Sequence, residues 1–231
     1  MKTATLEQGM KVQKMIVDKG IPTEQLQWAF DSGALSDLFD ANLTDFNRDA
    51  FRTFLGLKPL NPPAPSLLVP VGTMTVAATT TLFVARDRFV VNTGKKAPVK
   101  ISYLGDNFKD WFLEKVEQPF VGSTLKYGKL SRSSVDGPIL AELGGEAEAE
   151  TTLTELYSLM EVQKNGENGT LLTNGYANIF YVRDVTGTLR AVDAAWYDDG
   201  WYVFADAVSD PDTWVDDYRV FSRDFRSPLA A

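Results

Sequence analysis

The pattern of apolar positions changes once along the chain, from a helical period to a strand period. In the first 57 residues apolar side chains fall on helical faces, as Leu6, Met10 and Val17 do. Prolines at 62, 63 and 65 cannot continue a helix, and from Leu67 onward β-branched residues and a period of two take over. The pattern divides the chain into a helical module at 1–57, a Pro-rich linker at 58–66 and a body at 67–231.

Within the body, runs of alternating residues predict strands separated by turns. The expected strands are 67–71, 73–84, 88–93, 98–104, 124–131, 138–143, 175–184, 188–197 and 201–208. One helix is expected after Asp106, and another after the capping box formed by Thr152 and Glu155. Hairpin turns outnumber βαβ crossovers. The predicted fold class is therefore α+β: a helical N-terminal module followed by a mostly antiparallel β-sheet body with two or three packed helices.

The hairpin of strands 188–197 and 201–208 holds the strongest candidate site. A two-residue Asp199-Gly200 turn places Asp193 directly opposite Asp206 and collects apolar residues on the other face. A three-residue loop that includes Asp198 would instead mix Val192 with Asp206 on one face, so the first register is preferred. If Thr186-Gly187 makes the preceding turn, strand 175–184 adds polar residues to the face of the two aspartates. The candidate binding residues are Asp193, Asp206, Tyr197, Tyr202, Tyr176 and Asn178, with Phe180 beside them.

Opposed carboxylates are unfavourable unless water screens them, a cation bridges them or one is protonated. Ringed by Tyr and Asn, such a pair suits a divalent cation, a sugar, or a division of acid and base roles. A solvated sheet face is the simpler interpretation, because exposed faces routinely carry such residues. The metal is left open, and no catalytic residue is assigned.

Composition removes much of the remaining chemistry. The chain has no His and no Cys, which excludes imidazole and thiolate nucleophiles, the Ser-His-Asp triad and thiolate zinc sites. Asp210, Asp212, Asp216 and Asp217 hint at calcium, but Trp214 stands where an EF-hand needs a ligand. No complete catalytic constellation is left, so the prediction leans away from an enzyme, and no cofactor is expected.

The net charge of −8 is concentrated near the C-terminus, since residues 146–231 alone carry −10. Such a surface repels nucleic-acid phosphate. A helix-turn-helix-like segment at 25–44 has two aspartates and no Lys or Arg in its would-be recognition helix at 36–42, so nucleic-acid binding is not expected. A basic group in the middle of the chain keeps that role as a minor alternative: Arg86, Arg88, Lys95, Lys96 and Lys100.

The uncharged stretch 59–85 is long enough to span a bilayer, but its prolines and threonines argue against a membrane helix. The N-terminus shows no signal-peptide pattern. The sequence therefore predicts a soluble, cytoplasmic protein. It does not specify an oligomeric state.

Several segments of the body resemble an uncharacterised family of predicted proteins from environmental bacterial genomes. They are 83–93 (FVARDRFVVNT), 100–108 (KISYLGDNF), 134–139 (SVDGPI), 141–145 (AELGG), 172–184 (LTNGYANIFYVRD) and 219–223 (RVFSR). The resemblance covers 67–224 and implies no activity and no functional residue.

Two functions are carried forward. The first is a non-catalytic protein that acts through contacts with another protein, which the charge asymmetry and the aromatic content favour. The second is a carboxylate-based hydrolase, or a divalent-cation or glycan-binding domain, that uses Asp193 and Asp206.

Overall fold

The structure is a computed structural model that describes residues 5–40, 47–60 and 65–223. The chain divides into two units, 1–63 and 64–231, and each is described by itself. Residues 41–46, which end the helix-turn-helix-like segment, and residues 61–64, within the Pro-rich linker, lie outside the described residues.

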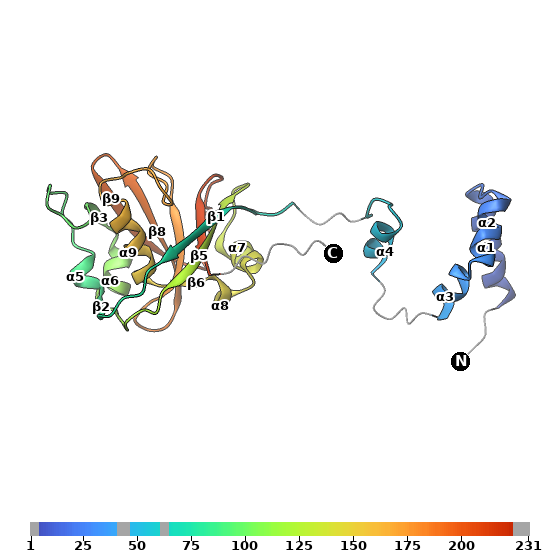
Figure 1. Cartoon of the computed structure of the whole chain (residues 1–231), viewed down its shortest axis with the longest axis horizontal. Coiled ribbons are helices and arrows are strands. Elements are labelled where there is room, and N and C mark those ends of the chain that lie inside the picture. Colours follow the sequence, from blue (N-terminus) through green and yellow to red (C-terminus); the bar gives the residue numbers. More distant parts are fainter. Residues whose placement is uncertain (1–4, 41–46, 61–64, 224–231) are drawn as a thin grey trace. The chain divides into compact units, whose positions relative to one another are not determined.

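The first unit consists of short helices (Figure 1). They are α1 (Leu6–Asp18), α2 (Thr23–Asp31), α3 (Ala34–Asp40) and α4 (Arg48–Phe54). A capping box of Thr5 and Gln8 starts α1, and the Asn47 side chain caps α4. No described side chain of α1, α2 or α4 is buried, and the apolar stripe of α1 is exposed, with Leu6 83% accessible.

The second unit is built on an eight-stranded sheet in the order β1-β5-β10-β7-β8-β9-β3, with β6 beside β7. Its strands are β1 (Leu68–Val76), β3 (Ile101–Leu104), β5 (Ser123–Leu130), β6 (Glu150–Thr151), β7 (Asn178–Arg183), β8 (Leu189–Tyr197), β9 (Gly200–Ala207) and β10 (Arg219–Ser222). Neighbours in the series β1-β5-β10 and β7-β8-β9 are antiparallel. The pairs β10–β7, β3–β9 and β6–β7 are parallel. The predicted α+β class with a mostly antiparallel sheet is confirmed, but the sheet is mixed.

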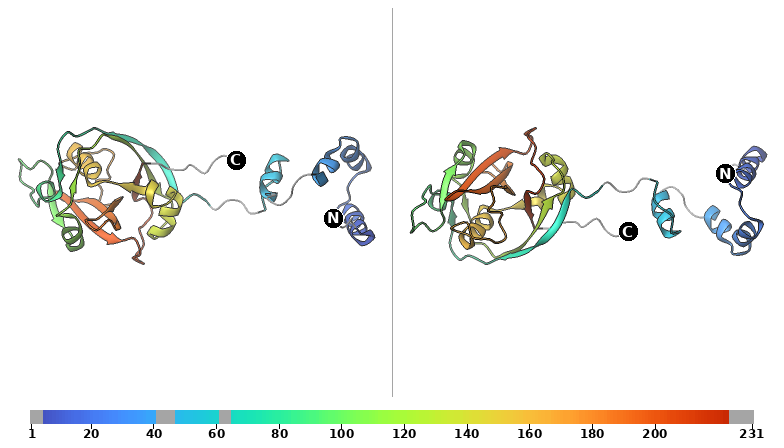
Figure 2. Two further views of the ribbon diagram at one scale, coloured as in Figure 1. Left: turned by 90° about the horizontal axis from the view of Figure 1, so that it is seen from below. Right: turned by 90° about the horizontal axis from the view of Figure 1, so that it is seen from above.

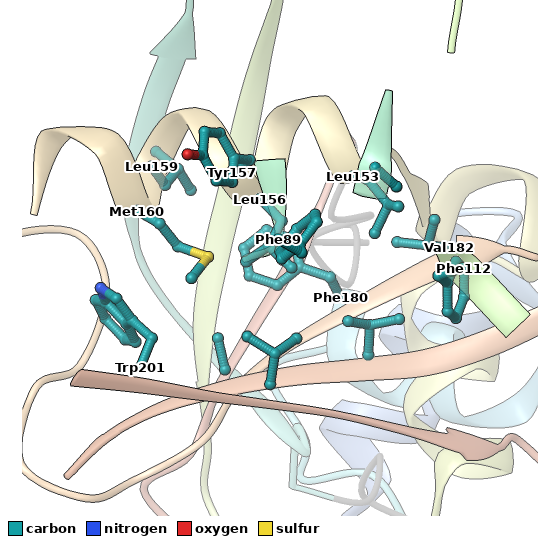
Figure 3. Close-up of a cluster of buried hydrophobic side chains, with 14 of the residues drawn as sticks. Phe89, Phe112, Leu153, Leu156, Tyr157, Leu159, Met160, Phe180, Val182 and Trp201 are labelled. Atoms are coloured by element: carbon teal, nitrogen blue, oxygen red, sulfur yellow. The ribbon is translucent and has the colours of Figure 1, made fainter. Parts of the chain in front are cut away.

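Helices cover both faces of this sheet (Figures 1 and 2). They are α5 (Ala85–Arg88), α6 (Asp106–Phe112), α7 (Asp136–Leu143), α8 (Glu146–Ala149) and α9 (Leu153–Val162), and a small separate sheet pairs β2 (Phe83–Val84) with β4 (Val116–Glu117). On one face α9 buries Leu153, Leu156 and Met160 against Phe180 and Trp201 (Figure 3). On the other face α7 and α8 pack over a second apolar cluster around Ile179 and Tyr181. The two apolar clusters occupy much of both sheet faces. A functional site on the sheet must therefore lie on a part of a face that neither cluster covers.

Two predicted strands are wrong. Residues 138–143 form most of helix α7, where Pro138 lies in the first turn, a position that proline favours. Within 88–93 the chain closes helix α5 and then makes one isolated bridge, between Asn92 and Ile101. Strand β10 was not expected at all. This short strand pairs with β5 on one side and with β7 on the other, and its Val220 and Phe221 are fully buried.

None of the helices in the described part of the chain is both long enough and apolar enough to cross a membrane.

Candidate functional site

The hairpin β8–β9 has the predicted faces but a different register. Its turn is Asp198-Asp199, so Tyr197 pairs with Gly200 and not with a residue further along. Asp198 takes a positive φ of 48°, which Asp tolerates better than most residues. Gly200 is needed for another reason: a Cβ there would lie 2.2 Å from the Ser102 Oγ of neighbouring β3. The glycine serves strand packing, and the turn is one residue earlier than the sequence suggested.

This register puts Asp193 opposite Phe204 and puts Asp206 opposite Ala191. The expectation that the two aspartates stand directly opposite each other is therefore wrong. The pairing moved by an even number of residues, so every side chain keeps its face. Asp193 and Asp206 remain diagonal neighbours on one face of the sheet, together with Tyr197 and Tyr202.

The expected contribution of β7 to this face is also wrong. The Asp184 N–H donates a hydrogen bond to the Thr188 carbonyl across a three-residue loop, where the sequence predicted a two-residue turn. Each side chain of β7 therefore points to the face opposite to the predicted one, and Ile179, not Phe180, lies beside Asp193. Asn178 and Phe180 lie on the opposite face. The Asn178 amide accepts a hydrogen bond from the Leu172 N–H and donates to the Leu172 and Ala194 carbonyls, which is a structural role.

Tyr176 lies two residues before β7, so its position in the site is not set by strand pairing. Its ring lies 5.6 Å from that of Tyr218, and a Cβ at the neighbouring Gly175 would lie 3.2 Å from the ring of Tyr197. The structure therefore brings together five of the six predicted residues, Asp193, Asp206, Tyr197, Tyr202 and Tyr176, and places Asn178 elsewhere.

Asp193 is the most unusual residue of this face. It is only 7% exposed, between Ile179 and Phe204 in the neighbouring strands. No hydrogen bond or ion pair joins its carboxylate to any residue of the described ranges, although its oxygens are not fully sealed from solvent. Burial, and then the charge of Asp206, raise the pKa of Asp193 to about 7. An unpartnered carboxylate costs stability unless a proton or a cation neutralises it.

Next to it lies a cleft of about 240 Å³, which we name the acidic cleft. Its lining residues are Asp136, Asp206, Asp210, Asp212, Thr213, Trp214 and Tyr218. Asp136 begins α7 and accepts hydrogen bonds of 2.7 Å from both the Tyr181 hydroxyl and the Trp214 indole N–H. These two bonds hold the segment before β10 over the sheet, and they shape the wall of the cleft.

The charges in and beside the cleft are uncompensated. Burial raises the pKa of Asp136, and the charges of Asp206 and Asp210 raise it further against the two hydrogen bonds. Burial, and then Asp210 and Asp212, raise the pKa of Asp206. Among the described residues, no Lys or Arg forms an ion pair with Asp136, Asp193, Asp206, Asp210 or Asp212. The site therefore favours a cation.

A metal ion is not the natural occupant. Within the ranges that the structure covers, no three acidic side chains converge closely enough to hold a metal. Calcium takes six to eight oxygen ligands and magnesium demands near-octahedral geometry.

Aromatic rings continue the site along the sheet. Tyr103, Tyr197, Tyr202 and Phe204, which we name the aromatic strip, form a chain with ring-centre distances between neighbours of 5.2 to 5.8 Å. Tyr103 and Tyr197 are 40% and 43% exposed. On the other side of Asp193, Tyr218 bridges Tyr176 and Trp214. Burial raises the pKa of Tyr218, and the charges of Tyr197 and Asp193 raise it further, which shows that these groups are close. Asp193 thus lies between two rows of rings.

Sequence reasoning missed half of this site. Asp136, Trp214 and Tyr218 come from segments that no pattern joined to the hairpin. Asp210 and Asp212 were noticed only as a failed calcium loop. Their signal was the acidic and aromatic composition of 206–218, which alone does not say where the segment folds back.

A larger cleft, of about 590 Å³, lies between the β4–β5 connection and the start of α9. Several of its polar groups are already engaged with one another. The Glu117 carboxylate accepts hydrogen bonds from the N–H groups of Leu153 and Thr154, and the Ser123 hydroxyl donates to Glu155. The Ser123 hydroxyl is held by Glu155 in this way, so size alone does not make this cleft a site.

Compared with protein-family models, with curated proteins and with solved structures, the chain has no match, and its function is to be inferred from the chemistry of this face.

Proposed function

We propose that the chain is a soluble, cytoplasmic, non-catalytic protein that acts through contacts with another protein. The body binds its partner through the acidic cleft and the aromatic strip. One observation carries the proposal: five carboxylates without a basic partner lie next to partly exposed aromatic rings on one face. Tyr and Trp are enriched at protein interfaces, where they supply large contact area and a polar group.

Other features support the same proposal. The acidic face repels phosphate, which argues against nucleic acid. In the basic group considered for nucleic acid, Arg86 pairs with Glu114 and Arg88 lies 3.8 Å from Glu161, so two of its charges are already balanced.

The test is affinity purification from cells of the native host, with wild type and matched variants as bait. Asp206→Asn removes a charge from the cleft, and Asp87→Asn makes the same charge change on α5, which contributes nothing to the site. We expect a partner that wild type and Asp87→Asn retain and that Asp206→Asn and Tyr202→Ala lose. A partner that all four baits retain equally would place the interface elsewhere and contradict the proposal.

The second candidate is a carboxylate-based hydrolase, or a divalent-cation or glycan-binding domain. A specific observation favours it, because Asp193 has a pKa of about 7 and Asp206 lies on the same face. A protonated acid beside a second carboxylate, with aromatic rings for stacking, is the arrangement of many glycoside hydrolases. Burial of Asp193 argues against it, since a general acid must reach the substrate.

Oligosaccharide binding and hydrolysis, measured with wild type and Asp193→Asn, separate the two candidates. A glycan that binds or is cleaved only by wild type would favour the second candidate. Thermal unfolding with and without Ca²⁺ or Mg²⁺ checks the divalent-cation form of the same idea, since a ligand that binds the fold raises the midpoint.

A further inference from the structure

The acidic cleft has the chemistry of a receptor for one organic cation. We propose that it binds a basic side chain, Lys or Arg, presented by the partner protein, with the cation held between the carboxylates and the rings of Trp214 and Tyr218. This inference rests on the proposed function and specifies the chemistry of the partner.

Charge gives the first step. Asp206, Asp210 and Asp212 line one small cleft with Asp136. The charges of Asp210 and Asp212 oppose ionisation of Asp206, and those of Asp206 and Asp210 oppose ionisation of Asp136. No basic side chain among the residues that the structure describes neutralises them. A positive group that enters the cleft therefore relieves repulsion as well as forming new ion pairs.

An independent observation comes from Asp193. Its carboxylate is nine-tenths buried and has no partner in the described ranges, yet its oxygens are not fully sealed. Its charge acts on Tyr218, which lines the cleft, and the charge of Asp206 acts on it in turn. A buried polar group without a partner is rare in folded proteins. Asp193 does not line the cleft itself, so a cation bound there would offset its charge through the field and not by a direct contact.

The walls distinguish an organic cation from a metal. Trp214 and Tyr218 lie 6.3 Å apart, ring centre to ring centre, on the wall of the cleft, and Tyr176 continues the row. Aromatic faces attract ammonium and guanidinium groups, an attraction that grows when water is excluded. The same rings offer a hydrated metal ion no ligand comparable to a carboxylate or a carbonyl.

Size favours one side chain over a larger molecule. The cleft measures about 240 Å³, below the roughly 300–1,000 Å³ of typical small-molecule sites. An oligosaccharide would have to lie mainly outside it. A Lys or Arg side chain on a partner can insert while the partner's surface covers the aromatic strip, as anchor residues do in protein interfaces.

The experiment is calorimetric titration of the full chain with short synthetic peptides of glycine and lysine, glycine and arginine, and glycine and acetyl-lysine. The acetylated peptide keeps the shape of the first but has no charge. We expect wild type to bind at least one basic peptide and not the acetylated one. Raising the salt concentration should weaken that binding.

Variants show whether the cleft is responsible. Asp206→Asn is expected to weaken binding by about tenfold or more, whereas Asp87→Asn, with the same net charge, leaves it unchanged. Tyr218→Ala should also weaken binding although it changes no formal charge at neutral pH. Thermal unfolding of each variant confirms that it folds. Equal losses for Asp206→Asn and Asp87→Asn would show unspecific charge attraction and overturn the inference.

Failure of this inference is distinguishable from failure of the proposed function. A partner that depends on Asp206 and Tyr202 in affinity purification, with no binding of either basic peptide, would overturn the basic side chain and keep the protein interface. Binding of a basic peptide at the cleft without any such partner would support the receptor chemistry and contradict the proposed protein contact.

Discussion

Substituting Asp193 by Asn removes the one carboxylate that the fold buries without a partner. In wild type its pKa is about 7, against an ordinary value of 3.8, which we take for the unfolded chain. Between these two values the folded chain keeps a proton that the unfolded chain has released. The contribution of Asp193 to the free energy of unfolding therefore falls as pH rises through this window. The asparagine variant cannot ionise at this position and so lacks this pH-dependent contribution.

The size of the effect follows from the interval between the two pKa values. Each pH unit corresponds to about 1.4 kcal/mol, so the whole interval amounts to about 4 kcal/mol. The free energy of unfolding of Asp193→Asn minus that of wild type should therefore grow by about 1.4 kcal/mol per pH unit between about pH 5 and about pH 7. Only well below the ordinary pKa of 3.8 are both side chains neutral in both states, and there the pH dependence of the difference should vanish.

The measurement is urea unfolding, followed by tryptophan fluorescence and far-UV circular dichroism from about pH 4 to about pH 8. The difference between variant and wild type isolates Asp193, because every other titrating group is common to both chains. Two titrating neighbours are coupled to Asp193 and are retained in the variant: Asp206 on β9 and Tyr218 before β10. Asp87→Asn serves as the control and should follow the wild-type curve.

Parallel curves for wild type and Asp193→Asn at every pH would refute the reasoning. They would mean that Asp193 ionises in the fold as easily as in water, and so that it is neither buried nor near Asp206. A constant offset without pH dependence would have the same meaning, since only the slope reports the proton.

Three further substitutions test the rest of the fold by urea unfolding. Burial opposes ionisation of Asp184, but hydrogen bonds from Thr186 and Arg190 outweigh it and lower its pKa to about 2. Asp184→Asn should therefore cost about 1.5–3 kcal/mol at neutral pH, less as pH falls from about 4 toward about 2. Leu156→Ala should cost about 2–5 kcal/mol, because it leaves a cavity beneath α9. Gly166→Ala should cost more than about 1 kcal/mol, since φ is +76° and its Cβ would lie 2.2 Å from the Trp196 ring.

Exposed counterparts provide the controls. Leu6→Ala, at a residue that is 83% accessible, should change stability by less than about 0.5 kcal/mol. Gly137→Ala meets no atom within 4 Å and should likewise have a small effect. Loss of stability in these controls as large as in Leu156→Ala or Gly166→Ala would contradict the burial and the close contact on which those two predictions depend.

Local patterns determined much of the second unit. Alternation of apolar and polar residues placed β8 and β9 correctly and assigned every side chain of the hairpin to its face, including Asp193 and Asp206. The capping box of Thr152 and Glu155 marked the start of α9, where both reciprocal hydrogen bonds form. These features depend on neighbours in sequence, so the sequence contains them directly.

Register and parity were decided by tertiary contacts. Gly200 looked like a turn residue, but it is required by the approach of Ser102 on β3, a strand nearly a hundred residues earlier. The Asp184 side chain accepts hydrogen bonds from the Thr186 and Thr188 N–H groups and so fixes a three-residue loop, which turns Asn178 away from the site. A single residue in a loop reverses a whole strand, and no alternation within β7 itself reveals it.

The site depends on both kinds of information. The sequence by itself determined that two aspartates and two tyrosines share one face of a hairpin, because side-chain direction alternates along a strand. Only the tertiary structure joined Asp136 and Trp214 to them, through hydrogen bonds between segments 78 residues apart. Burial is likewise a property of the assembled fold, since Asp193 becomes an unusual acid only when β7, β9 and the segment before β10 close around it.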